Sequence, residues 1–398
     1  MREGWEVKTL KDACELITCG VAARPKYVDE GVPFLSAKNV KNGQIIYKNY
    51  NCITKENHQE LTKKNKPLQG DILYTRVGSY GEAAVVEKNI EFSVFVSLTL
   101  IKPKQDLLNS YFLKYYLNSH EIKTLAKNSI TSSGVGNLNV GTVRKFPIKL
   151  PPLSEQTQIV KTLDSAFAQI DQAKANLEKN LANAKELFQS KLNEVFSQRG
   201  EGWVEKTLKE VCEKITDGTH QTPKYFDDGV IFLSSRNVTS GKIDWDNIKY
   251  IDEEQHIAMH KRVAPKVGDI LLAKNGTTGV AAMVDRDVIF DIYVSLAHIR
   301  VLDSVLPHYM LHFINSPIAK KQFNQRLKGT GVPNLHLKEI REVVIPFPES
   351  LVKQNEIIKV LNSFSEITNK ATNSYQQKLN NLEELKKSIL EKAFRGEL

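Results

Sequence analysis

The sequence contains two copies of one unit. Gly4–Lys11 (GWEVKTLK) returns as Gly202–Lys209 (GWVEKTLK), a shift of 198 residues. Further matches at the same shift are Pro25–Tyr27 with Pro223–Tyr225, Phe34–Ser36 with Phe232–Ser234, Gly70–Leu73 with Gly268–Leu271, and Val96–Leu98 with Val294–Leu296. A repeat this long indicates a duplicated domain, because solenoid repeats have periods of roughly 20–50 residues. Two copies of one binding domain suggest a target that itself has two parts.

Composition places the chain among globular proteins. It has 398 residues, of which 41% are hydrophobic and 25% charged, which suits packed cores. We expect no membrane span, since no apolar run approaches the roughly 18 residues that a span needs. No secretion signal is visible at the N-terminus, so we expect a cytoplasmic protein. The cysteines Cys14, Cys19, Cys52 and Cys212 lack zinc-finger spacing.

The charge is distributed unevenly between the copies. The net charge of the chain is +9. Residues 1–152 hold 22 Lys and Arg against 14 Asp and Glu, whereas residues 202–350 hold 19 of each. A basic excess suits a surface that faces phosphates, but an ordinary solvated surface explains it equally well. The neutral second copy means that charge alone identifies no partner.

Each copy is predicted to hold an α+β domain. Segments 32–35, 71–74, 83–86 and 94–100 are rich in β-branched and aromatic residues and predict strands. Apolar residues at helical spacing predict a helix over 108–125. The second copy repeats the pattern, with strands at 270–272, 280–284 and 292–299 and a helix near 309–327.

Two long helices follow the domains. No Pro or Gly interrupts 153–196, and Ser154 can cap the helix at its start. Apolar residues at alternating steps of three and four form a heptad seam, and each helix spans roughly 60 Å at 1.5 Å per residue. The seam residues are Val160, Leu163, Phe167, Ile170, Leu177, Leu181, Ala184, Phe188 and Val195, with Lys174 and Lys191 filling two steps, and Leu361, Phe364, Ala371, Tyr375, Leu382, Leu385 and Ile389.

A seam of this length needs a partner, because an isolated apolar stripe would face water. We expect the two helices to form an intramolecular antiparallel coiled coil with pseudo-two-fold symmetry. The alternative is that each helix packs on its own domain. The predicted organisation is a first domain over 1–150, a central helical region over 151–200, a second domain over 201–349 and a C-terminal helical region over 350–398.

Enzyme motifs are missing from the sequence. It contains no phosphate-binding loop of the Gly-x-x-x-x-Gly-Lys-Ser/Thr type, no His-Glu-x-x-His and no Gly-x-Ser-x-Gly. His256 with His260 and His308 with His312 have the i, i+4 spacing of helical metal ligands. We interpret them as ordinary surface histidines of one copy, and we predict no catalytic residue, no metal and no cofactor.

Three polar loops recur in both copies instead. The first is 74–81, matched by 273–279; the second is 133–138, matched by 330–335; the third is 36–39, matched by 234–237. Their side chains are of the types that read base edges and hold phosphates, although Gly and Asn are also expected in plain turns. Arg76 and Lys274 are the strongest candidates. The full set of candidate DNA-binding residues is Lys38, Asn39, Arg76, Ser79, Tyr80, Asn137, Arg236, Asn237, Lys274, Asn275, Thr277 and Asn334.

The chain resembles a type I restriction-modification specificity subunit over its whole length. The resemblance rests on the duplication, the Gly-Trp-x-x-x-Thr-Leu opening of each copy, Leu150–Gln156 (LPPLSEQ) before the first long helix, and the end Ala393–Leu398 (AFRGEL). The start of the second helix, Pro346–Gln354 (PFPESLVKQ), keeps the prolines and the glutamine with one extra residue.

The resemblance implies a non-catalytic subunit with two target recognition domains. Such a subunit joins two DNA methyltransferase subunits, which methylate adenine N6, and restriction subunits complete the endonuclease. Each recognition domain reads one half of a split site in double-stranded DNA, and the helices act as spacer and docking surface. S-adenosylmethionine, ATP and magnesium belong to the partners. The differing charge of the two copies predicts two different half-sites and therefore an asymmetric target.

Three other functions are weighed against this one. A stand-alone nuclease or methyltransferase would need the missing motifs. A coiled-coil scaffold without a DNA role would lack sequence-specific binding that survives moderate salt. A specificity subunit that serves a methyltransferase without a restriction partner would have the same sequence features, so the sequence leaves that alternative open.

Overall fold

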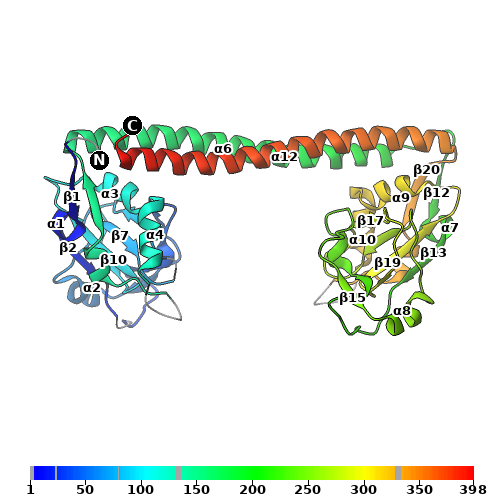
Figure 1. The fold of residues 1–398 in the computed structure, drawn as a ribbon, viewed down its shortest axis with the longest axis horizontal. Helices are drawn as coiled ribbons and strands as arrows, with labels where there is room; N and C mark the ends of the chain where they lie inside the picture. The colour runs from blue at the N-terminus through cyan, green and yellow to red at the C-terminus, as the bar shows by residue number, and fades with distance from the viewer. Residues whose placement is uncertain (1–3, 23–24, 79, 131–135, 328–332) are drawn as a thin grey trace. The chain divides into compact units, whose positions relative to one another are not determined.

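The computed structural model describes residues 4–22, 25–78, 80–130, 136–327 and 333–398. The chain divides into two compact units, Met1–Leu177 with Gln377–Leu398, and Glu178–Gln376. Each unit combines one globular module with parts of both long helices (Figure 1). The predicted fold class is confirmed: two α+β modules occur together with two long packed helices.

The first module runs from β1 to β11 and holds short helices between its strands. Its elements are β1 (Glu6–Thr9), α1 (Leu10–Ala13), β2 (Cys14–Cys19), β3 (Val32–Leu35), the 3-10 turn η1 (Ala37–Asn39), β4 (Val40–Lys41), β5 (Gln44–Ile45), β6 (Asn51–Ile53), α2 (Lys55–Thr62), β7 (Ile72–Thr75), β8 (Ala83–Val85), β9 (Ser93–Val94), β10 (Leu98–Pro103), α3 (Ser110–Leu117), α4 (His120–Asn128), α5 (Val140–Arg144) and β11 (Pro147–Leu150).

A four-stranded sheet in the order β2-β10-β7-β8 lies at the centre of this module. Ile72 and Tyr74 of β7 belong to one apolar cluster, which includes Phe112 of α3. Leu73, between them, belongs to a second cluster with Leu35 of the three-stranded sheet β6-β3-β9. Because successive side chains of a strand point to opposite faces, both faces of the central sheet are buried. This explains why its strands are apolar without alternation.

The second module repeats this plan from β12 to β20. Its central sheet has the order β13-β19-β16-β17, and its second sheet the order β15-β14-β18. The elements are β12 (Trp203–Thr207), α7 (Leu208–Val211), β13 (Cys212–Asp217), β14 (Val230–Leu233), η2 (Ser235–Val238), β15 (Lys249–Ile251), α8 (Glu253–His260), β16 (Ile270–Ala273), β17 (Ala281–Met283), β18 (Phe290–Ile292), β19 (Leu296–Val301), α9 (Pro307–Ile314), α10 (Pro317–Arg326), α11 (Leu337–Arg341) and β20 (Val344–Pro348).

Two predicted elements are each divided in the structure. The strand expected over 94–100 becomes β9 and β10, because the Leu98 amide donates to the Phe95 carbonyl (2.9 Å) and closes a turn between two sheets. The helix expected over 108–125 ends at Leu117, and Ser119 caps α4 by accepting from the Ile122 amide. The second module divides at the same places, since Ser316 caps α10 ahead of Pro317.

The long helices α6 (Leu153–Phe196) and α12 (Leu351–Arg395) pack on each other in antiparallel fashion. In the first unit Lys386 Nζ lies 3.1 Å from Asp171 Oδ1, and Lys174 Nζ lies 2.6 Å from Glu383 Oε1. In the second unit Lys191 Nζ lies 5.7 Å from the centre of the Phe364 ring. The residue number on α12 falls as that on α6 rises, as antiparallel packing requires.

Among the residues that the structure describes, no helix is long and apolar enough to cross a membrane.

The predicted seam is wrong at one position. Leu385, predicted to face the partner helix, is 47% exposed. Lys386 occupies the contact instead, with Nζ 4.8 Å from the centre of the Phe167 ring. The long aliphatic stem of a lysine can cover apolar surface while its charge stays in water. Lys386 therefore packs on the partner helix at the place where the periodicity predicted Leu385.

Both helices begin on one module and end on the other. Gln156 near the start of α6 is buried, accepts from the Asn109 amide (2.8 Å) and donates to the Leu107 carbonyl (3.0 Å). At the end of α12, the Phe394 ring packs on Phe112 and Tyr116 of the same module, with ring centres 5.3 and 5.1 Å apart. The alternative in which each helix packs only on its own module is therefore wrong for the helix ends.

The second module receives the helices in the same way. Phe196 at the end of α6 packs edge-on against Tyr309 and Phe313 of α9 at 5.3 and 5.5 Å. Gln354 near the start of α12 accepts from the Leu306 amide and donates to the Ser304 and Pro348 carbonyls, each at 2.9 Å. Each module core is thus completed by one helix start and one helix end.

Candidate nucleic-acid interface

The loop 36–39 is organised by a buried asparagine. Asn39 accepts from the Ser36 amide (3.1 Å) and donates to the Ile46 and Lys48 carbonyls, both at 3.1 Å. These bonds fix the turn η1, and they leave the preceding side chain, Lys38, exposed. The structure therefore gives Asn39 contacts within the fold, whereas Lys38 is accessible to a ligand.

The matching loop 234–237 has the same construction. Asn237 accepts from the Ser234 amide (3.0 Å) and donates to the Asp244 (3.2 Å) and Asn247 (3.0 Å) carbonyls. Arg236 is exposed, like Lys38. The repeated asparagine is thus the fixed part of the loop, and the exposed cation before it is the part that differs between the modules.

Aromatic side chains surround this loop, and sequence reasoning missed them as a site. In the first module the ring of Phe34 lies 6.2 Å from that of Tyr27 and 6.0 Å from that of Phe95, centre to centre. These rings line an open hollow of about 330 Å³. Its other lining residues are Ser36, Ala37, Lys38, Asn51 and Ser97.

The aromatic trio recurs in the second module. Phe232 lies 6.1 Å from Tyr225 and 6.2 Å from Tyr293, and Lys249 Nζ lies 3.8 Å from the centre of the Tyr225 ring. The signal was present in the sequence, since the shift that relates the copies aligns Tyr27 with Tyr225 and Phe34 with Phe232. Aromatic rings next to cations offer stacking surfaces and charge at the same place.

Arg76 holds two loops of the first module together. It is 7% exposed, and its guanidinium donates from Nε to the Leu138 carbonyl (2.9 Å) and from Nη1 to the Val96 carbonyl (3.0 Å). The Leu138 amide donates back to the Arg76 carbonyl (2.8 Å). The described end of the second predicted loop, 136–138, therefore lies beside the first loop, whereas 133–135 lie outside the described residues. The side chain of Arg76 is engaged within the fold. Its predicted contact with a base stays a prediction.

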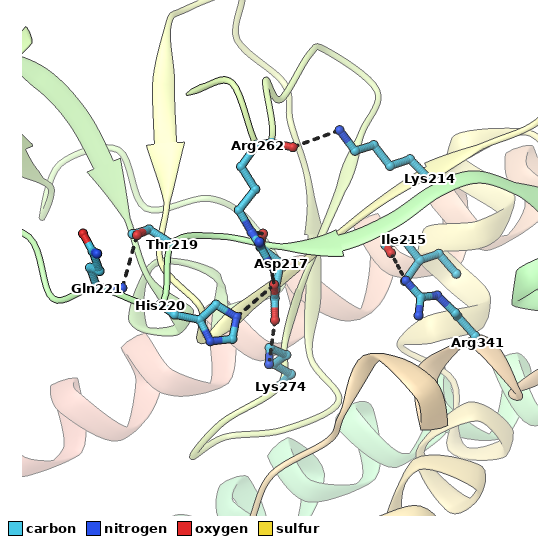
Figure 2. A network of polar contacts seen from close by, with 9 residues as sticks. All are labelled: Lys214, Ile215, Asp217, Thr219, His220, Gln221, Arg262, Lys274 and Arg341. Atoms are coloured by element: carbon cyan, nitrogen blue, oxygen red, sulfur yellow. Dashed lines mark hydrogen bonds and ion pairs between the residues drawn. The ribbon is translucent and has the colours of Figure 1, made fainter. Parts of the chain in front are cut away.

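Lys274 occupies the matching position and is held by an ion pair. It is 5% exposed, and its Nζ lies 3.1 Å from Asp217 Oδ2. Asp217 also binds Arg262 Nη2 (2.6 Å) and His220 Nε2 (3.3 Å), as Figure 2 shows. Burial works to raise the pKa of Asp217, but the hydrogen bonds from Arg262 and Lys274 outweigh it and hold that pKa below its usual range. Asp217 was not among the predicted residues.

The remaining candidates lie near these loops. Asn137 and Thr277 are exposed, Tyr80 is half-buried, and Ser79 lies outside the described residues. Asn275 forms a β-bridge with Asn334, as Val77 does with Asn137 in the first module. The side-chain oxygens of Asn275 and Asn334 are buried and have no hydrogen-bond partner among the described residues. A donor on a ligand would satisfy such oxygens, because a buried polar atom without a partner is costly.

A sequence comparison decides the family. The model of the "type I restriction modification DNA specificity domain" matches residues 2–182 and again residues 200–382. The chain belongs to this family. The two matches follow the duplication, and they assign the DNA-specificity role to both copies. The resemblance stated from the sequence is thereby confirmed.

Curated relatives and solved structures agree with the assignment. The chain is 27% identical to the EcoBI specificity subunit of Escherichia coli over 75% of this chain and 68% of the relative. It is 25% identical to the EcoKI specificity subunit of Escherichia coli K12, over 100% of this chain and 89% of the relative. The HsdS subunit of Thermoanaerobacter tengcongensis shares the fold (TM-score 0.58, 17% identity, 100% and 98% coverage).

A second solved chain has a more similar fold. It comes from a study described as the structural basis of complex assembly and conformational transition of the type I R-M system, with TM-score 0.81, 19% identity, and coverage of 100% and 99%. The protein is thus a DNA specificity subunit of the type I restriction-modification kind, a role that is itself non-catalytic.

Proposed function

We propose that this specificity subunit reads a bipartite, asymmetric target in double-stranded DNA, one half-site per module, across a gap of fixed length. The observation that carries the proposal is the recurrence of one loop with one changing residue. The buried Asn39 and Asn237 fix matching turns through the same pattern of hydrogen bonds. Each turn carries a different exposed cation, Lys38 or Arg236, beside an aromatic trio. A turn that is fixed in the same way in both modules, with an exposed residue that differs, suits two domains that recognise different DNA sequences.

The two cations suit different contacts. Arginine presents a planar fork that binds the O6 and N7 atoms of guanine at once, whereas lysine acts as a point charge toward phosphate or a single acceptor. We therefore rank Lys38 and Arg236 first as DNA contacts. Arg76 and Lys274 stabilise the loops through their buried contacts. Base contacts by these two residues are also part of the proposal. Asn137, Asn275, Thr277 and Asn334 complete the surface at the adjacent loop.

The long helices supply the spacing and the docking surface. We propose the division 1–150 and 201–349 for the recognition domains, and 151–200 and 350–398 for the helical regions. Two adenine-N6 methyltransferase subunits dock on the chain, and restriction subunits complete a cytoplasmic complex. Catalysis and its cofactors reside in those partners, because the target adenine must leave the stacked duplex to react and needs a pocket outside this chain.

Methylome sequencing tests the function directly. The chain is expressed with its neighbouring methyltransferase gene, with and without a restriction gene, in a host that lacks other adenine methylation. The proposal expects a split motif with one N6-methyladenine on each strand and a constant gap. Absence of such a motif from an assembled complex would favour the coiled-coil scaffold. A split motif that persists without any restriction gene, at a locus that encodes none, would assign the chain to a methyltransferase-only system.

A further inference from the structure

Two histidines and a buried aspartate meet in the second module. His256 and His260 lie one turn apart on α8, and both rings face Asp291 on β18. His256 Nδ1 lies 2.7 Å from Asp291 Oδ2, and His260 Nδ1 lies 3.1 Å from Asp291 Oδ1. The imidazole rings are 4.7 Å apart, centre to centre. The three side chains come from two elements, α8 and β18, and converge on one point.

The burial of this group is unusual for a carboxylate. The Asp291 side chain is 1% exposed, and those of His256 and His260 are 13% and 31% exposed. A buried carboxylate is costly unless a positive charge or several donors compensate it. In the part of the chain that the structure describes, the two histidines are the ion-pair partners of Asp291. Neutral imidazoles offer hydrogen bonds but no positive charge, whereas a bound cation supplies that charge.

The first module shows what this place looks like without such a group. His58 matches His256, and its Nδ1 lies 2.9 Å from the hydroxyl of Ser93, which matches Asp291. Thr62 matches His260 and donates to the His58 carbonyl (2.7 Å). His58 and His256 therefore occupy matching positions in the two copies. The interpretation of His256 as a surface histidine of one copy overlooked this match. Relative to the first module, the second has His260 in place of a threonine and Asp291 in place of a serine. These two differences turn a histidine–serine pair into a set of three side chains that can each bind a metal ion.

We propose that His256, His260 and Asp291 form a zinc site that fastens α8 to β18, a feature beyond the proposed DNA reading. Each histidine offers an imidazole nitrogen and Asp291 a carboxylate oxygen, and these three ligand atoms all lie within 4.8 Å of one another. A tetrahedral ion with bonds of about 2.0–2.2 Å places its ligands about 3.4 Å apart. Each histidine contacts a different carboxylate oxygen, at 2.7 and 3.1 Å, so these two N···O pairs need to open by about 0.7 and 0.3 Å to reach that spacing.

The donor types select the class of metal. Two imidazole nitrogens and one carboxylate suit Zn²⁺ and similar transition ions, whereas Ca²⁺ and Mg²⁺ prefer sites built from oxygen alone. With three protein ligands, the fourth position falls to water. The partial exposure of His260 gives the ion and that water access from the surface.

Zinc stoichiometry on the full chain tests the proposal. Untagged protein is stripped with a chelator, incubated with Zn²⁺, desalted and measured by elemental mass spectrometry. The test variants, His260→Thr and Asp291→Ser, carry the residues of the first module, which tolerates them within the same fold. The control is His308→Gln, which alters the other i, i+4 histidine pair. Circular dichroism of each variant verifies folding.

We expect one zinc per chain in the wild type and in His308→Gln. In each test variant zinc affinity falls by more than the roughly 10–100-fold that loss of a supporting partner alone causes. Zinc also raises the thermal unfolding midpoint of the wild type and not of the test variants. Less than stoichiometric zinc in the folded wild type, or equal binding by wild type and test variants, would overturn the proposal, and the cluster would then be a hydrogen-bonded triad. Neither result depends on DNA binding, so the proposed function is judged separately.

Discussion

Lys274 Nζ lies 3.1 Å from Asp217 Oδ2, and the first module has no acid at the position that matches Asp217, because Cys19 stands there. Arg76, which matches Lys274, binds backbone carbonyls instead. The same loop is thus held by an ion pair in one module and by neutral acceptors in the other. This difference contributes to the contrast between a basic first copy and a neutral second copy.

Replacing Asp217 with Cys, the residue of the first module, should destabilise the second module. The change leaves Lys274 buried without its acid and also removes the carboxylate that pairs with Arg262. Breaking a buried ion pair from one side costs about 3–5 kcal/mol. Thermal unfolding of the full chain measures the loss. The double variant Asp217→Cys with Lys274→Arg rebuilds the arrangement of the first module and should recover part of it; a double variant no more stable than the single one would contradict this account.

Replacing Arg76 with Ala should lower the stability of the first module. The carbonyls of Leu138 and Val96 lose their donor, and a buried group without a partner costs about 1–3 kcal/mol. Unfolding of the full chain and methylation of a library of half-sites are measured together. If Arg76 also reads a base, binding weakens by roughly 1–3 kcal/mol and preference relaxes at one position. Unchanged stability would show that the two carbonyl contacts contribute nothing.

Gln156 and Gln354 should be the most sensitive polar residues of the long helices. Gln156 satisfies three backbone groups, those of Asn109, Leu107 and Pro151, of which the first two are partly buried and the last is buried. Gln156→Met keeps the length of the side chain and leaves these groups unpaired, so we expect a loss of about 2–4 kcal/mol. Gln158→Met, at an exposed position two residues later, should change stability by less than about 0.5 kcal/mol. Equal effects of the two substitutions would contradict the anchoring role.

Asp269 and Asp71 occupy matching positions, and their contributions to the stability of the two modules should change in opposite directions as pH falls. Burial works to raise the pKa of Asp269, but hydrogen bonds from His298 and Arg300 outweigh it and lower this pKa to about 2. The pKa of the matching Asp71 is raised by burial, which its contact with Lys102 does not overcome. Because the folded pKa of Asp269 lies below the unfolded value, its stabilisation is present above about pH 4 and is lost as pH falls toward 2. Asp71 contributes no such loss.

Hydrogen exchange of the full chain between pH 5 and pH 2.5 resolves the modules separately. The loss due to Asp269 amounts to about 2 kcal/mol at the acid limit. Asp269→Asn should flatten the acid response of the second module, whereas Asp71→Asn should leave that response unchanged. A second module whose stability is constant over this range in the wild type would refute the prediction.

Periodicity and repetition predicted most of the fold. The shift of 198 residues revealed the modules, and the heptad seam revealed the helix pair, because both signals extend over many residues. The breaks at Ser119 and at Phe95 were missed since each depends on a single cap or turn. Leu385 was misplaced because a lysine stem packs as well as a leucine at a half-exposed seam.

The site was less predictable than the fold. The loops were identified from residue type, which does not distinguish a side chain held inside the fold from one that projects outward. Asn39 binds its own backbone and Arg76 is buried, whereas Lys38 is exposed. The aromatic trio joins residues more than sixty positions apart, Tyr27 and Phe95, so it became visible as a cluster only in three dimensions.

Replacing each exposed cation with alanine should weaken recognition of one half-site and leave the other unchanged. Lys38→Ala should weaken methylation that depends on the half-site of the first module, and Arg236→Ala that of the second, each by roughly 1–3 kcal/mol if the residue reads a base. A phosphate contact would instead weaken binding to all sequences and reduce its salt dependence. Both side chains are exposed, so protein stability should hardly change. Asn39→Ala is the matched control, because it removes the turn-fixing bonds and should lower stability as well as recognition. Methylome sequencing of each variant decides: if Lys38→Ala and Arg236→Ala leave both half-sites and all affinities unchanged, these cations do not contact DNA, and the adjacent loop with Asn137 and Asn334 becomes the leading candidate.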